Sequence, residues 1–127
     1  MDQMRELNAL TEKVIGLAID VHRALGPGLL ESAYRKCLCY ELKHHSLQFI
    51  EEEPVPLKYK DLLIDCAYRA DIIVENKLVV EIKSVDRIEP VHEAQLLTYL
   101  KLRCIKVGLL LNFNVKLLKD GIVRKIL

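Results

Sequence analysis

The stretch DIIVENKLVVEIKS, residues 71–84, decides the fold of this chain. Two runs of β-branched residues flank a short polar break, which predicts two strands joined by a tight turn. Both strands nevertheless contain charged residues, namely Asp71, Glu81 and Lys83. Charged side chains are rarely fully buried unless they are paired or bind a metal. These three therefore lie either on a solvated face of the sheet or in a functional site.

The length of the turn determines whether the charged side chains meet. A two-residue loop at 76–77 pairs Asp71 with Ile82 and places Asp71 and Glu81 on opposite faces. A three-residue loop at 75–77 instead pairs Asp71 with Glu81 on one face, because side chains alternate along a strand. A β-bulge has the same effect. The sequence leaves these possibilities open.

A metal ion explains a paired arrangement better than stability does. Two carboxylates about 4 Å apart repel by about 4 kcal/mol at an effective dielectric near 20. A divalent cation between them replaces this repulsion with coordination, and hard oxygen ligands favour Mg²⁺ or Mn²⁺. Lys83, on the same face as Glu81, is then placed to orient or deprotonate water, or to stabilise charge on a phosphate. The simpler alternative is a polar strand face in contact with water.

The remaining segments predict an α/β fold with the order ααβββαβββ, in which helices pack against a mixed β-sheet. Apolar residues recur at three- and four-residue steps in the first two segments, and a Gly-Pro-Gly break at 26–28 separates them. A proline favours the first turn of the third helix. The expected helices are 4–25, 29–45 and 89–102, and the expected strands are 49–60, 62–74, 77–85 and 105–113, followed by a hairpin within 115–127. We expect one domain over residues 1–127.

Composition limits the classes of function. The chain has 127 residues, 51% hydrophobic and 29% charged, with a net charge of +1. It lacks a strongly basic surface, so nucleic-acid binding would need a local patch or a metal. No signal peptide or long apolar span is present, which favours a cytoplasmic protein without membrane contact. Without paired CxxC spacing, the cysteines are expected to be reduced and mostly structural: Cys37, Cys39, Cys66 and Cys104.

Three motifs together resemble a known family. GLLESAY at 28–34 matches the signature GxxExxY, and RADIIVENKLVVEIKS at 69–84 is similar to the D…ExK strands of PD-(D/E)XK nucleases. QLLTY at 95–99 is similar to the QxxxY helix motif of their RecB-like branch. The chain therefore resembles GxxExxY proteins with a restriction-endonuclease-like core, from about Leu7 to Phe113. Ala70 stands where the superfamily name has proline.

The resemblance assigns roles to residues of this chain. It implies metal ligation by Asp71, Glu81 and the backbone carbonyl of Ile82, with Mg²⁺ or Mn²⁺ as the cofactor. Lys83 would be the catalytic lysine. The remaining implied roles are an additional metal-binding or metal-tuning acid at Glu31, an orienting group for the lysine or water at Gln95, and substrate contacts at Tyr99 and Tyr34.

Other residues favour simpler interpretations. His92, Gln95 and Tyr99 share one helix face because they are three and seven residues apart. Tyr34 is expected to be a core tyrosine whose hydroxyl reaches the site. His22 occupies the place of a histidine ligand in some RecB-like nucleases, yet its apolar surroundings favour a packed histidine. Lys116 and Lys119 form either a basic patch or a charged edge that resists aggregation.

The expected function is Mg²⁺-dependent hydrolysis of phosphodiester bonds in DNA or RNA through the D…ExK site. The alternative is a catalytically quiet nuclease-like domain that binds protein or nucleic acid, since fold does not fix function. Retention of the whole charged set favours the enzyme, whereas the low net charge favours the binding module or an enzyme with a partner. A homodimer or a protein partner remains open.

Overall fold

The computed structural model describes residues 2–127, apart from the side chains of Cys66 and Ala67. It contains three α-helices, one 3₁₀-helix and one five-stranded sheet within this range. The helices are α1 (Asp2–Leu25), α2 (Glu31–His44), α3 (Pro90–Arg103) and the 3₁₀-helix η1 (Leu118–Gly121), and the strands are β1 (Phe49–Tyr59), β2 (Leu62–Val74), β3 (Leu78–Lys83), β4 (Val107–Asn112) and β5 (Ile122–Ile126).

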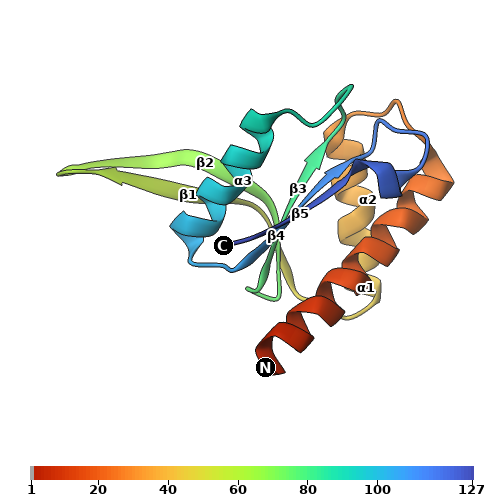
Figure 1. Cartoon of the computed structure of the whole chain (residues 1–127), viewed down its shortest axis with the longest axis horizontal. Helices are drawn as coiled ribbons and strands as arrows, with labels where there is room; N and C mark the ends of the chain where they lie inside the picture. The colour runs from red at the N-terminus through yellow and green to blue at the C-terminus, as the bar shows by residue number, and fades with distance from the viewer. Residues whose placement is uncertain (1) are drawn as a thin grey trace.

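The sheet is mixed, as the sequence predicts, and its strands follow the order β1-β2-β3-β4-β5. All neighbours are antiparallel except β3 and β4, which are parallel and connected through α3. Figure 1 shows the sheet between α3 on one side and α1 with α2 on the other. No helix in the described residues is long and apolar enough to cross a membrane.

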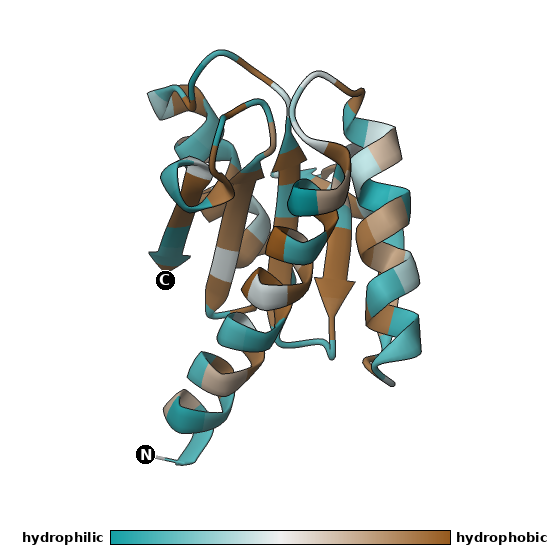
Figure 2. Cartoon of the chain, turned by 90° about the vertical axis from the view of Figure 1, so that its right-hand side faces the viewer, coloured by the Kyte–Doolittle hydropathy of each residue, from teal (hydrophilic) through white to brown (hydrophobic). Residues whose placement is uncertain are grey.

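Two hydrophobic cores hold these layers together. The face of the sheet under α1 and α2 is built from alternate strand residues such as Ile72, Val80 and Leu109, which belong to one core cluster with Val14 and Leu38 from the helices. The apolar strands behind these helices are visible in Figure 2. The residues between them in sequence point to α3, because side chains alternate across a strand. Each strand near the middle of the sheet thus contributes to both cores.

Close packing fixes α3 on its face of the sheet. Gly108 of β4 lies directly beneath the helix, where an added Cβ would come 2.7 Å from Cδ1 of Leu96. Ile73, Val79 and Leu100 complete this second core. Because the helix can approach only where no side chain intervenes, Gly108 sets the depth at which α3 lies.

The C-terminal segment differs from the predicted hairpin. The residues Leu118–Gly121 form η1, and the following strand β5 pairs with β4 rather than with a strand of its own. Asp120-Gly121 resembles a hairpin turn in sequence, but Leu118 is buried against the core and pulls this segment into a helical turn. The expected first strand of the hairpin is therefore absent from the described residues.

Strands β2 and β3 separate at Asp71 and Glu81, and we call this point the sheet fork. The β2–β3 ladder runs only from Ile72 with Val80 to Val74 with Leu78. Beyond Ile72, β2 leaves β3 and continues with β1 alone as a two-stranded arm, which projects from the body in Figure 1. Asp71 and Glu81 are the first residues past the end of the ladder.

Candidate active site

The hairpin brings Asp71 and Glu81 face to face. Val74 pairs with Leu78, so the loop has three residues, and Glu75 and Asn76 adopt positive φ angles of 53° and 55°. This is the longer of the two predicted turns, and it places both acids on the face toward α3. The backbone N–H of Asp71 donates to Oε2 of Glu81 at 2.8 Å.

A second hydrogen bond completes a reciprocal pair. The backbone N–H of Ile82 donates to Oδ2 of Asp71 at 2.7 Å. Each carboxylate thus accepts a hydrogen bond from a backbone N–H of the opposite strand, in place of the backbone carbonyl that a continued ladder would supply. Side-chain acceptors at these two positions let the strands separate without leaving buried N–H groups unpaired. The sheet fork and the acid pair are therefore one structural feature.

Burial gives this pair unusual electrostatics. Glu81 is only 4% exposed. Its burial, together with the neighbouring Asp71 carboxylate, raises the pKa of Glu81 to about 8. Burial also raises the pKa of Asp71, although the Ile82 N–H and Lys83 act in the opposite direction. In the metal-free protein at neutral pH, the pair therefore retains a proton that two separate surface carboxyls would lose.

Lys83 and the carbonyl of Ile82 flank the acids. The positive charge of Lys83 lowers the pKa of both acids, so its amine lies near them. The carbonyl of Lys83 accepts a hydrogen bond from the N–H of Phe113, beyond the end of β4, at 2.9 Å. Successive carbonyls of a strand point to opposite sides, so the carbonyl of Ile82 points toward β2 and the acid pair.

Glu31 approaches the site from the first turn of α2. Its Oε2 accepts a hydrogen bond from the N–H of Ser84 at 3.2 Å. Oγ of Ser84 donates in turn to the carbonyl of Leu29 at 2.8 Å. The charge of Glu31 contributes to raising the pKa values of Asp71 and Glu81, though less than burial does. Glu31 therefore stands beside the pair, held by the end of β3.

Tyr34 holds the loop that carries Glu31. It is fully buried and stacks on Phe113 with ring centroids 4.4 Å apart. Its hydroxyl donates to the carbonyl of Gly26 at 2.5 Å and accepts from the N–H of Leu29 at 3.1 Å. The expectation that Tyr34 belongs to the core agrees with this burial. A direct contact between Tyr34 and substrate does not, because no part of the ring is exposed.

Arg35 is a site residue that the sequence analysis missed. It lines an open pocket of about 480 Å³ together with Glu31 and Ser84. Its guanidinium forms ion pairs with Glu51 at 3.2 Å and Glu52 at 3.3 Å, and it lowers the pKa of Asp71. The signal was its position four residues after Glu31, which places both side chains on one helix face.

The third helix contributes Tyr99 more directly than Gln95. Burial raises the pKa of Tyr99 to about 12, with further contributions from Glu81 and Asp71, so the tyrosine lies close to the acids. Gln95 is exposed on the preceding turn. His92 is used for capping, since its Nδ1 accepts from the N–H of Glu89 at 2.9 Å.

The predicted ligands do not form a closed cluster. Among the described residues, no three histidine, cysteine, aspartate or glutamate side chains stand close enough to hold one metal ion. Asp71 and Glu81 meet, while Glu31 remains on Ser84. His22 is not part of this set. Its Nε2 lies 3.1 Å and 2.8 Å from the carbonyls of Phe113 and Val115, as expected for a packed histidine.

Asn112, also missed in the sequence, closes the end of the site beside Lys83. It is buried at the end of β4, opposite Lys83 of β3. Its amide donates to the carbonyl of Val85 at 2.9 Å, and its oxygen accepts from the N–H of Val85 at 3.1 Å. The ends of neighbouring parallel strands meet at one edge of a sheet, which was the available signal.

The cysteines stand apart from this chemistry. Cys37, Cys39 and Cys104 are free thiols. Burial raises the pKa of Cys39 to about 12, which keeps it protonated. The side chain of Cys66 lies outside the described residues.

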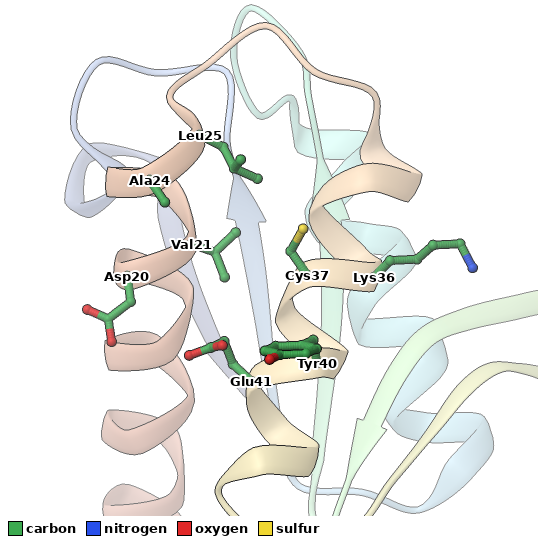
Figure 3. Close-up of a pocket in the computed structure, with 8 residues that line it drawn as sticks. All are labelled: Asp20, Val21, Ala24, Leu25, Lys36, Cys37, Tyr40 and Glu41. Carbon is green, nitrogen blue, oxygen red and sulfur yellow. The ribbon is translucent and has the colours of Figure 1, made fainter.

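A hollow of about 490 Å³ between α1 and α2 contains none of the predicted site residues (Figure 3). Val21, Leu25 and Cys37 point into it, and charged side chains such as Asp20 and Lys36 lie at its rim. It lacks the convergent polar groups of a catalytic site. The predicted site residues therefore lie away from this hollow.

The family of the chain agrees with this geometry. No curated protein and no solved structure matches the chain significantly. A family model described as the PD-(D/E)XK nuclease superfamily matches residues 8–125. The match spans both acids, Lys83, most of α1 and all of α2 and α3, and the mixed sheet flanked by helices is consistent with a restriction-endonuclease-like fold. The chain belongs to the PD-(D/E)XK nuclease superfamily.

Proposed function

We propose that this chain is a single nuclease-like domain of the GxxExxY type that hydrolyses phosphodiester bonds in DNA or RNA with Mg²⁺ or Mn²⁺. The observation that carries the proposal is the pair of Asp71 and Glu81 at the sheet fork, where the pKa of Glu81 is raised to about 8. Such a pair disfavours the metal-free ionised state, and strongly perturbed acids are typical of functional sites. Superfamily membership supports the same reaction class.

The donor set fits a hard divalent cation. Asp71 and Glu81 each use one oxygen for a backbone N–H, which leaves Oδ1 and Oε1 available. The carbonyl of Ile82 points to the same side. Carboxylate and carbonyl oxygens are the ligands that Mg²⁺ and Mn²⁺ prefer. When bound, the ion would lower the pKa of water and neutralise charge on the phosphate. Glu31 would tune this centre from its position on Ser84.

Other residues of the chain would then orient the attacking water and neutralise charge on the phosphate. Lys83 supplies a positive charge beside the acids, suited to a developing phosphate charge or to positioning the attacking water. Gln95 is exposed and can orient the lysine or that water. Tyr99 places its hydroxyl near the acids for a phosphate contact. Tyr34 serves as a positioning residue, because its hydroxyl fixes the loop that carries Glu31.

A binding module without catalysis is the second candidate. It is favoured by the incomplete convergence of Glu31 with the acid pair. In that case the domain would bind nucleic acid or a protein, as a monomer or a homodimer, and the acid pair would remain protonated rather than metal-bound. The two candidates differ in two observables, which are turnover and metal binding.

Cleavage of labelled single- and double-stranded DNA and RNA tests the proposal. Wild-type protein would be compared with Lys83→Ala and with the control Lys43→Ala, whose side chain is exposed near the end of α2. We expect wild-type protein to cleave with Mg²⁺ or Mn²⁺, and EDTA to abolish this cleavage. Lys83→Ala should reduce cleavage by at least 100-fold, on the order of general acid–base effects. Lys43→Ala should cleave as wild type does. Folded wild-type protein that neither cleaves any substrate nor binds Mn²⁺ would favour the binding module.

A further inference from the structure

A basic pocket is lined in part by Gly26, at the start of the loop that leads to Leu29 and Glu31. It has a volume of about 310 Å³ and is bounded by the end of α1 and the segment around η1. Four of its lining residues are basic or imidazole side chains, and no acidic side chain lines it in the described residues. We call it the basic pocket: His22, Arg23, Lys116 and Lys119, with apolar neighbours.

The cations of the basic pocket have no acidic partners among the described residues. Arg23, Lys116 and Lys119 are exposed, and none forms an ion pair within 4.0 Å in that part of the chain. Arg35 and Arg103, in contrast, each contact a glutamate of β1. Three like charges around one hollow repel each other. An anion in the hollow would remove that repulsion.

His22 gives the pocket a rigid wall. It is 5% exposed, and its Nε2 lies within hydrogen-bond distance of the carbonyls of Phe113 and Val115. Carbonyls only accept, so Nε2 carries the hydrogen. Nδ1 of His22 has no hydrogen-bond partner in the described part of the chain. Among the described residues, every fully buried side-chain nitrogen or oxygen has a hydrogen-bond partner, so Nδ1 is not fully buried. Nδ1 therefore faces the pocket, while the bond to Val115 fixes the segment that carries Lys116.

The basic pocket lies close enough to the acid pair for one short nucleic-acid strand to reach both. Gly26 lines it, and Leu29 lines the pocket that contains Glu31. The three peptide units from Gly26 to Leu29 span at most about 11 Å, and the three peptide units from Ser84 back to Glu81 have the same limit. With the contact between Leu29 and Ser84, the whole path is at most about 28 Å. At about 3.4 Å per nucleotide, this corresponds to no more than about eight nucleotides.

We propose that the basic pocket binds a backbone phosphate of the nucleic-acid strand whose scissile phosphate lies at Asp71 and Glu81. This inference rests on the proposed nuclease function and specifies how the substrate is held. The pocket offers cationic side chains to a phosphodiester, contacts that position a strand without reading its bases. It also supplies the local patch that a chain with a net charge of +1 requires.

Three substitutions test the pocket against a control of equal charge. The variant Arg23→Gln/Lys116→Gln/Lys119→Gln is compared with Lys13→Gln/Lys36→Gln/Lys43→Gln, which removes three exposed cations from α1 and α2. Binding of a labelled 16-nucleotide strand is followed by fluorescence anisotropy at several salt concentrations, in Ca²⁺ to suppress cleavage. Circular dichroism verifies folding, and Lys119→Gln alone replaces the triple variant if that variant does not fold.

We expect the pocket variant to bind the strand at least tenfold more weakly at low salt. The slope of log K against log salt should be shallower by about 0.7, because each neutralised phosphate contributes about 0.7 on a single strand and the pocket holds one phosphate. Lys119→Gln alone should weaken strand binding and reduce the slope in the same direction, by less than the triple substitution does. Hydrolysis of the small substrate bis(p-nitrophenyl) phosphate should be unchanged, since its single phosphodiester would occupy the acid pair and needs no second phosphate site.

The outcomes separate the two proposals. Unchanged strand binding in the pocket variant, or an equal loss in the control, overturns the phosphate site while leaving cleavage by wild-type protein intact. If wild-type protein cleaves nothing but strand binding still depends on the pocket, the phosphate site stands and the nuclease function fails. A loss of bis(p-nitrophenyl) phosphate hydrolysis in the folded pocket variant would also contradict the proposal, because it would place the pocket in the catalytic chemistry.

Discussion

Replacing Glu81 with glutamine should stabilise the metal-free protein at high pH. The raised pKa of Glu81, about 8 against an ordinary 4.5, means that the folded state binds a proton which the unfolded state releases. The contribution of Glu81 to the free energy of unfolding is therefore highest below about pH 4.5 and falls as pH rises toward 8. Glutamine has no charge to bury, and its amide oxygen can still accept the N–H of Asp71.

The magnitude follows from proton linkage. Moving a carboxyl pKa from 4.5 to about 8 destabilises the fold by about 5 kcal/mol above pH 8. At pH 5 only about 1 kcal/mol of this is present, because Glu81 is then protonated in the folded protein and only partly ionised in the unfolded one. The free energy of unfolding of Glu81→Gln, relative to wild type, should therefore rise by up to about 4 kcal/mol between pH 5 and pH 9.

Urea unfolding measures this difference directly. Wild type, Glu81→Gln and the control Glu12→Gln, an exposed substitution on α1, would be unfolded at pH 5, 7 and 9 in EDTA and followed by circular dichroism. Equal m-values would show that the denatured states are comparable. Saturating Mn²⁺ should then stabilise wild type and leave Glu81→Gln unchanged. A Glu81→Gln protein that is less stable than wild type at pH 9, or a difference that does not vary with pH, would refute the reasoning.

Three substitutions test the surroundings of the acid pair. Tyr34→Phe should lower the free energy of unfolding by about 1–2 kcal/mol in urea titrations, because Gly26 and Leu29 lose their shared partner, and full stability would remove the loop-positioning role. Ser84→Ala should cost about 1 kcal/mol and reduce cleavage without weakening Mn²⁺ binding in calorimetry. Gly108→Ala should cost about 1–3 kcal/mol in thermal unfolding, because the added Cβ meets a side chain of α3 at 2.7 Å, whereas an unchanged melting temperature would show that the helix shifts freely.

The sequence predicted the fold well where one pattern governs one element. The amphipathic first helix, the Gly-Pro-Gly break and the apolar strand at 105–113 needed only periodicity and turn residues. The C-terminal hairpin was wrong because local turn chemistry at Asp120-Gly121 was outweighed by burial of Leu118 and by pairing with β4. Tertiary contacts of that kind leave no local signal.

The site was predictable in its acids and less so in its supporting residues. The meeting of Asp71 and Glu81 depended on a three-residue turn that the sequence allowed but did not select. Arg35 was visible as a helix neighbour of Glu31, yet its ion pairs depend on β1, which is remote in sequence. Asn112 and the backbone carbonyl of Ile82 become meaningful only once the strand order is known.

Calorimetric titration of the protein with Mn²⁺ tests the central claim most directly. The titration would be run at pH 7 in two buffers of different ionisation enthalpy, which reports proton release. Because the pKa of Glu81 is about 8 before binding, we predict that Mn²⁺ binds with the release of about one proton, and that Asp71→Asn and Glu81→Gln each abolish binding. Absence of binding to wild-type protein, or binding that survives both substitutions, would contradict the assignment of the sheet fork as the metal centre.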